Sequence, residues 1–178
     1  IHGFELNPDS VQAARGNYLE ALGRLSEGLA ASEVPVFQRD AILGPAGDGQ
    51  AYDFVVGNPP WVRWDYLDQN YREATRPLWE RYGLFSLKGF AARLGGGKKD
   101  LSMLFTYAAA DRYLRSGGVL AFVITQEVFQ SKGAGEGFRR FRLGNEGPLL
   151  GVRAVHDFVR VRPFKDAANK TAAIFLTK

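Results

Sequence analysis

Residues 101–125, LSMLFTYAAADRYLRSGGVLAFVIT, decide the fold class of this 178-residue chain. Apolar side chains recur at helical spacing over Leu101–Tyr113, and the Ser-Gly-Gly sequence at 116–118 is a glycine stop of the kind that ends many helices. Val119–Thr125 is then a continuous apolar run, typical of a strand buried on both faces of a sheet. A helix that leads through a glycine turn into a buried strand indicates an α/β domain.

Strands and helices are also predicted on both sides of this stretch. Short strands are expected at Ile1–Leu6, Pro35–Arg39 and Asp53–Val56, and later strands at Val152–Val159 and Thr171–Leu176. One helix is expected to begin near Asn7-Pro8-Asp9-Ser10, with Asn7 or Ser10 as its N-cap, and another to cover Phe129–Leu143. This alternation predicts a mostly parallel sheet, whereas the last two strands, with no helix between them, should form an antiparallel hairpin. No domain boundary is evident, so a single domain over residues 1–178 is expected.

The composition excludes several kinds of protein and site. Hydrophobic residues make up 46% of the chain, which fits a folded core, and no apolar run approaches the ~18 residues of a membrane span. There are no cysteines and two histidines, so we expect no disulfide and no bound metal. The first residues lack the charged-then-apolar pattern of a signal peptide, and a cytoplasmic location is expected.

The net charge of +4 is concentrated in residues 62–99, where eight basic residues stand against four acidic ones. The same segment contains Trp64, Trp79, Tyr66, Tyr71, Tyr82, Phe85 and Phe90. Basic residues interleaved with aromatic ones suit a nucleic-acid backbone and exposed bases. They equally suit a small subdomain whose aromatic residues form its own core. The two interpretations are compatible, and both stay open here.

The stretch Asp53–Trp61, DFVVGNPPW, places an amide and a large ring directly after a predicted strand. Ligands of parallel α/β sheets bind at the carboxyl ends of strands, which is where Asn58 lies. Two prolines stiffen the turn and remove two N–H donors, so the Asn58 side-chain oxygen and a neighbouring carbonyl can both accept hydrogens from one amino group. Trp61 could stack on the ring that carries this amine. The competing interpretation is an Asn-Pro turn followed by a core tryptophan.

Asn58-Pro59-Pro60-Trp61 resembles the (Asp/Asn)-Pro-Pro-(Tyr/Phe/Trp) motif of S-adenosylmethionine-dependent amino-methyltransferases. In its Asn form it is similar to the DNA adenine-N6 methyltransferases of the γ-type motif order, which include large restriction–modification and phage-defence enzymes. The resemblance covers nearly the whole chain and implies a Rossmann-like class I methyltransferase fold with an insertion at about 62–99. It also implies that Asn58 and the Pro59 carbonyl accept the N6 hydrogens of a flipped-out adenine, with no strong base and no metal.

The same resemblance assigns cofactor contacts to two strand ends and one helix. Glu5 would accept hydrogen bonds from the ribose hydroxyls of S-adenosylmethionine, and Leu6 would pack beside its adenine. Asp40, with Ala41 next to it, would read the adenine amine. Phe105, within a DLSMLF segment that resembles the family's DLYxxF, would line the adenine pocket. The competing interpretations are a solvated strand end, a loop-initiating Asp and an ordinary core aromatic.

The closing segment, 158–175, resembles the family's final hairpin, in which an aromatic residue stacks on the second face of the base. Phe164 is the best match, and a plain packing role is the alternative. One departure lies just after Thr125, where many relatives have proline and this chain has Gln126.

The family's first strand and its glycine-rich cofactor loop precede the strand that bears Glu5, and this chain starts on that strand. In the family's strand order, 3-2-1-4-5-7-6, the absent strand is central. We therefore expect a fragment of a larger polypeptide, or a strand supplied by another copy, or a sheet that closes the gap. An isolated fragment is expected to bind S-adenosylmethionine poorly and to be inactive.

The sequence thus predicts a site-specific DNA adenine-N6 methyltransferase of a restriction–modification or defence system. Two alternatives stay open. One is methylation of a protein glutamine or an RNA base, which related motifs also serve. The other is a non-catalytic fragment that binds nucleic acid.

Overall fold

The computed structural model describes residues 1–22, 34–45, 51–85, 99–131, 134–161, 163–164 and 169–178. Contacts between residues divide the chain into two compact units, residues 1–46 and 47–178. The described helices include none that is both long enough and apolar enough to cross a membrane.

The first unit is a strand–helix–strand arrangement, built from β1 (Gly3–Glu5), α1 (Pro8–Leu22) and β2 (Val36–Gln38). The two strands pair in parallel, with Glu5 opposite Gln38. Asn7 caps the helix, because its Oδ1 accepts hydrogen bonds from the backbone N–H groups of Asp9 and Ser10. Of the two predicted caps, Asn7 is therefore the one used, with Pro8 as the first helical residue.

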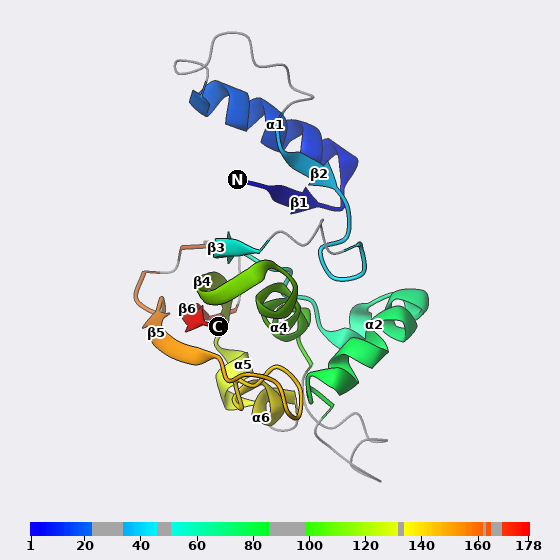
Figure 1. Ribbon diagram of the computed structural model, residues 1–178, viewed down its shortest axis with the longest axis vertical. Coiled ribbons are helices and arrows are strands. Elements are labelled where there is room, and N and C mark those ends of the chain that lie inside the picture. The colour runs from blue at the N-terminus through cyan, green and yellow to red at the C-terminus, as the bar shows by residue number, and fades with distance from the viewer. Residues whose placement is uncertain (23–33, 46–50, 86–98, 132–133, 162, 165–168) are drawn as a thin grey trace. The chain divides into compact units, whose positions relative to one another are not determined.

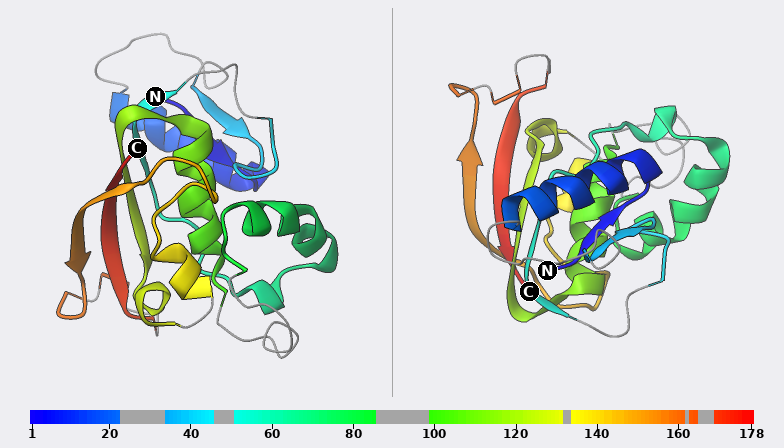
Figure 2. Two further views of the ribbon diagram at one scale, coloured as in Figure 1. Left: turned by 60° about the horizontal axis from the view of Figure 1, so that its bottom comes forward. Right: turned by 90° about the horizontal axis from the view of Figure 1, so that it is seen from above.

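The second unit contains a four-stranded sheet (Figures 1 and 2). Its strands are, in spatial order, β3 (Tyr52–Gly57), β4 (Leu114–Thr125), β6 (Thr171–Thr177) and β5 (Gly151–Asp157). β3 and β4 are parallel, whereas β6 is antiparallel to both β4 and β5. The predicted antiparallel hairpin at the end of the chain is thus confirmed. The sheet as a whole is mixed rather than mostly parallel, because β6 enters it antiparallel to both of its neighbours.

Helices α4 (Leu101–Tyr113), α5 (Glu127–Gln130) and α6 (Ala134–Phe138) lie on one side of this sheet (Figure 1). The strand residues that alternate toward them are almost fully buried, as Leu120, Ile124, Ile174 and Leu176 show. Burying one such side chain contributes about 1.5–3 kcal/mol. Between β3 and α4 the chain forms a short 3-10 helix, Trp64–Tyr66, and the helix α2 (Gln69–Arg81).

Two predictions for the second unit differ from the structure by more than one or two residues. β4 begins at Leu114 instead of Val119, so the glycine pair lies inside the strand, where Gly117 has a φ of +77°. A side chain at Gly118 would lie 3.0 Å from the Asp53 carbonyl oxygen, so β3 and β4 can approach here only with glycine. The predicted single helix over 129–143 is wrong, because the described residues of this range form two short helices, α5 and α6, and no helix beyond Phe138. Glycines at 133, 135 and 137 weaken a helix by about 1 kcal/mol each.

Candidate functional site

The turn after β3 presents Asn58 to solvent and buries Pro59 beneath it. β3 ends at Gly57, opposite Phe122 of the parallel strand β4, so the turn starts at the carboxyl edge of these two strands. The Trp61 indole Nε1 donates a hydrogen bond to the Val123 carbonyl oxygen at 3.1 Å. Trp61 is therefore attached to the carboxyl end of β4, and the stiff turn between β3 and Trp61 holds Asn58 at this edge of the sheet.

The structure brings together Trp61 and Phe164, the two aromatic residues predicted to hold the target base. Their ring centroids are 5.1 Å apart and the ring planes meet at 85°, an edge-to-face contact. A base that stacks between two parallel rings requires those rings to be about 7 Å apart, which is twice the ~3.5 Å contact distance of carbon atoms. As placed here, the two rings contact each other and leave no such gap.

Phe105 occupies a distinctive position on α4. Of the ten residues from Leu101 to Ala110, it alone is partly exposed, while the other nine are buried. The helix begins at Asp100, whose Oδ1 accepts hydrogen bonds from the Ser102 backbone N–H at 2.9 Å and from the Ser102 hydroxyl. Burial raises the pKa of the Asp100 carboxyl above its ordinary value. The Asp100 cap fixes the start of α4, and Phe105 lies one turn into this helix with its side chain partly exposed.

In the first unit, the four predicted cofactor residues gather at the carboxyl edge of β1 and β2. One carboxylate oxygen of Glu5 accepts the Asn7 N–H at 2.9 Å, and Leu6 is 62% exposed. Asp40 begins the loop after β2, where its Oδ1 accepts the Ile42 N–H at 2.6 Å and the Leu43 N–H at 2.8 Å. Asp40 thus does initiate a loop, as the competing interpretation holds, and Ala41 is the next residue of that loop.

The segment 62–99 contains a small aromatic core in its described part. Trp64 contacts Trp79 at 5.3 Å and Phe85 at 5.3 Å between ring centroids, and Trp79 is fully buried. Tyr82 is also buried, and its hydroxyl donates to Asp111 Oδ2 at 2.9 Å. The small-core interpretation therefore holds for these residues, while Lys88, Phe90, Arg93 and Lys98 lie outside the described residues.

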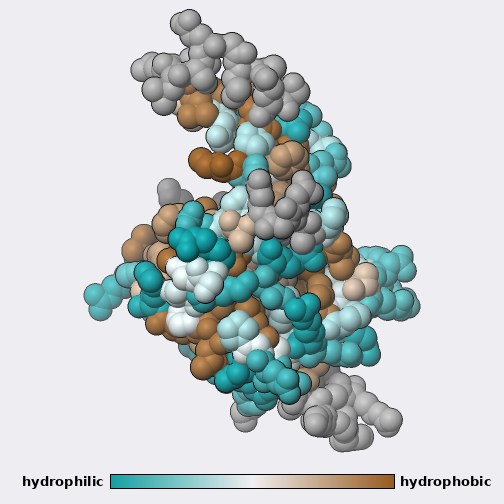
Figure 3. Space-filling model, viewed as in Figure 1, coloured by the Kyte–Doolittle hydropathy of each residue, from teal (hydrophilic) through white to brown (hydrophobic). Residues whose placement is uncertain are grey.

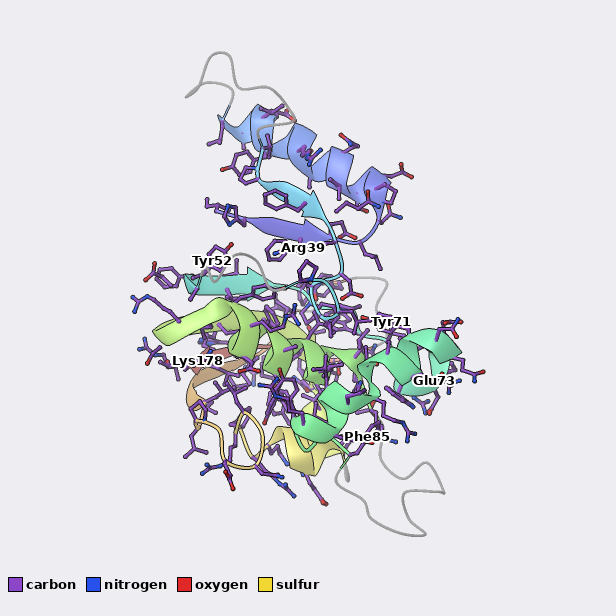
Figure 4. All side chains as sticks on the ribbon, turned by 45° about the vertical axis from the view of Figure 1, so that its right-hand side comes forward. Arg39, Tyr52, Tyr71, Glu73, Phe85 and Lys178 are labelled. Atoms are coloured by element: carbon purple, nitrogen blue, oxygen red, sulfur yellow. The ribbon has the colours of Figure 1, made fainter. Side chains whose placement is uncertain are left out.

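Basic side chains border this aromatic core. The Arg76 guanidinium lies 5.7 Å and the Lys99 ammonium 5.3 Å from the ring centroid of Phe85. Phe85 is labelled in Figure 4. Burial lowers the pKa of Lys99 below its ordinary value. Arg63 lies over Tyr66, whose ring is 74% exposed. Polar residues also cover the outer end of α2 (Figure 3). Both interpretations of the segment are therefore compatible with its structure, an aromatic core inside and cations outside.

Sequence reasoning noted Gln126 only as a departure, although its side chain makes specific contacts at the end of β4. The available signal was its position directly after an apolar strand, the same position that singles out Asn58. Among the described residues, no group of three or more His, Cys, Asp or Glu side chains could hold a metal ion.

Comparison with known protein families gives a match over most of the chain. Residues 15–149 match the model of the Eco57I restriction-modification methylases. The matched region includes the Asn58–Trp61 turn, the segment 62–99 and α4 through α6. A search of curated proteins found no match.

Proposed function

The chain belongs to the Eco57I restriction-modification methylase family, and from this membership we propose that it transfers a methyl group from S-adenosylmethionine to adenine N6 in DNA. Both units, residues 1–46 and 47–178, would serve one catalytic domain of Rossmann-like class I methyltransferase type. The observation that carries the proposal is the Asn58–Trp61 turn, which presents the Asn58 side chain to solvent at the carboxyl edge of β3 and β4.

In this proposal the turn acts on the adenine amino group. The Asn58 side-chain oxygen and the Pro59 carbonyl each accept one N6 hydrogen, which raises the electron density on nitrogen and aims its lone pair. The target base would be flipped out of the duplex, at a cost of about a few kcal/mol of unstacking. Catalysis is then positioning and electrostatics, and Asn58 needs no change of protonation state.

The residues at the edge of β1 and β2 fit the cofactor. The Glu5 carboxylate has a second oxygen besides the one that accepts the Asn7 N–H, and it would accept hydrogen bonds from ribose hydroxyls. Asp40 uses Oδ1 for its own loop, which leaves its second oxygen to accept from an adenine amine, with Ala41 beside it. In the first unit, exposed Leu6 would supply apolar contact to the adenine ring. Phe105 of the second unit, which is partly exposed, is a separate candidate for an apolar contact. S-adenosylmethionine, when bound, supplies the electrophilic methyl group.

The strand order supports the Rossmann-like arrangement. The sheet order β3-β4-β6-β5 matches positions 4-5-7-6 of the order 3-2-1-4-5-7-6, and the parallel pair β1-β2 matches positions 2 and 3. Position 1 has no counterpart among the described strands.

The test is methyl transfer by the full-length protein from labelled S-adenosylmethionine to DNA, to RNA and to protein, with the labelled product identified after hydrolysis. We expect label in N6-methyladenine from DNA, and its loss in Asn58→Ala by about 10²-fold or more in kcat, as for removal of one transition-state acceptor or donor. Asn145→Ala, at an exposed turn of the same unit, is the matched control and should keep full activity. Label confined to RNA or protein would sink the proposal.

A further inference from the structure

Gln126 joins the end of β4 to both ends of the loop between β5 and β6. Its side-chain Nε2 donates to Asp157 Oδ1 at 2.5 Å and to the Thr171 carbonyl oxygen at 3.2 Å. Its backbone N–H donates to the Lys170 carbonyl oxygen at 2.9 Å. Asp157 is the last residue of β5 and Thr171 the first residue of β6. One residue therefore fastens the point where the loop leaves the sheet and the point where it returns.

Asp157 extends this arrangement into the loop. The Oδ1 atom that accepts from Gln126 also accepts the Val159 backbone N–H at 2.7 Å. The Phe158 backbone N–H donates a hydrogen bond to the Thr171 carbonyl oxygen at 3.0 Å. We call the hydrogen bonds that Gln126 and Asp157 make with each other, Thr171 and Val159 the loop clasp.

The sheet does not need the loop clasp in order to form. The backbone ladders already pair Asp157 with Ala172 and Thr125 with Thr171. The Gln126–Asp157 bond lies at the surface, where the net contribution of one hydrogen bond is about 0.5–1.5 kcal/mol. The clasp therefore acts on the loop more than on the stability of the sheet.

The loop carries Phe164, and the end of β4 holds the partner of Phe164 as well. Val123, three residues before Gln126, accepts the Trp61 indole N–H. Trp61 in turn contacts Phe164 edge to face. Both members of the ring pair are thus attached at the carboxyl end of β4. Trp61 is bound to Val123 of the strand, and the loop that carries Phe164 is bound to Gln126, the residue after the strand.

We propose that Gln126 and Asp157 are positioning residues, which hold the β5–β6 loop so that Phe164 stays at the Trp61 ring beside Asn58. This inference rests on the proposed function, since it assigns the ring pair to the target base. Because the rings as placed leave no gap for a base, Phe164 must shift when a base enters. The loop clasp fixes described residues at the two ends of the loop, Asp157 and Val159 at one end and Thr171 at the other.

The first test is limited trypsin cleavage after Arg160, which needs no methyl transfer. Gln126→Ala and Asp157→Ala should both speed cleavage, and the effect of the double variant should be smaller than the two single effects combined, because both substitutions remove the shared Gln126–Asp157 bond. Arg153→Ala is the matched control. Its Nε donates to Thr177 Oγ1 at 2.5 Å, at the opposite end of the same hairpin, and it should leave the cleavage rate unchanged.

The second test measures steady-state methylation of DNA. Gln126→Ala should lower kcat by about 10- to 100-fold, the loss expected when a reacting group is misplaced by about 1 Å. Its affinity for S-adenosylmethionine, measured by calorimetry, and its melting temperature should stay close to those of Arg153→Ala. Gln126→Glu, which puts a second carboxylate next to Asp157, should be as impaired as Gln126→Ala. Adding Asp157→Asn to it should restore activity in part, because donor and acceptor are then exchanged.

Unchanged trypsin cleavage in Gln126→Ala would overturn the clasp. Faster cleavage with unchanged kcat on DNA would overturn its positioning role. If the unaltered protein methylated RNA or protein and not DNA, the proposed function would fail, while the cleavage test would still decide whether the clasp holds the loop.

Discussion

Asp100 combines two opposing demands in one side chain. It caps α4 through the Ser102 N–H and hydroxyl, which favours the ionised carboxylate, and it is largely buried, which disfavours it. Burial is the larger effect, so the pKa of Asp100 in the folded protein lies above its ordinary value of 3.8. As pH rises from 3.8 through this raised pKa, the folded state keeps a proton that the unfolded state has lost. Stability therefore falls over this window.

Asparagine at position 100 should remove the free-energy cost of burying a charged carboxylate, and its side-chain oxygen should still accept the Ser102 N–H. We expect Asp100→Asn to be at least as stable as the unaltered protein at pH 7. It should lose this relative advantage as pH falls to 3.8 and below, where the carboxyl of the unfolded state also takes up a proton. Asp100→Ala should be about 1 kcal/mol less stable than Asp100→Asn at both pH values, because it also removes the cap. Urea unfolding at the two pH values measures this. An advantage of Asp100→Asn that is equal at pH 4 and pH 7 would contradict the burial argument.

At the scale of elements, α6 is held to α4 by one buried tyrosine. The Tyr107 hydroxyl donates to the Phe138 carbonyl oxygen at 2.6 Å, and Phe138 is itself fully buried. Tyr107→Phe leaves that carbonyl without this donor, which should reduce the free energy of unfolding by about 1–3 kcal/mol. Denaturant titration gives the value. Tyr66→Phe, at a residue that is 74% exposed, is a control for the substitution itself.

Burial also makes this link sensitive to alkali, because it raises the pKa of Tyr107 to about 12. A raised tyrosine pKa contributes stability that is complete below the ordinary value of 10.0 and is lost as pH rises through about 12. The unaltered protein should therefore lose stability faster than Tyr107→Phe between these values. Parallel pH profiles of the two proteins would show that the Tyr107 hydroxyl is not responsible.

Local sequence signals predict those helices whose first residues include a capping side chain. α4 spans the predicted residues because Asp100 caps its start, and α1 begins where Asn7 and Pro8 indicate. The helix expected over 129–143 fails because hydrophobic spacing alone does not weigh the glycines at 133, 135 and 137. The mixed sheet could not be predicted from local spacing, because the partners of β6 are set by pairings between strands far apart in the sequence.

At the scale of the whole molecule, the same contrast applies to the candidate site. The Asn58–Trp61 turn and the acidic residues Glu5 and Asp40 could be singled out from the sequence, because each follows a predicted strand. The contact between Trp61 and Phe164 depends on the register of β4, β6 and β5, which no spacing along the chain reveals. The role of Gln126 was hidden for the same reason, since its partners are Asp157 and Thr171.

The distribution of charge gives the last prediction. The chain carries a net charge of +4, and Arg76 and Lys99 border the Trp64–Trp79–Phe85 core as cations that can meet a phosphate backbone. If each contacts one phosphate, Arg76→Ala and Lys99→Ala should each weaken DNA binding about equally for all sequences. Each should also reduce the slope of log K against log salt by about 1.

Arg115→Ala is the control for this experiment, because Arg115 is paired with Asp53 at 2.5 Å, at the end of β4 farthest from Gln126. It should leave both affinity and salt slope unchanged. The measurement is fluorescence anisotropy of labelled duplex DNA from low to physiological salt. A variant that weakens binding without changing the salt slope would act through the aromatic core, since a lost phosphate contact must release fewer counterions. Arg76 and Lys99 would then be packing residues of segment 62–99 rather than contacts to DNA.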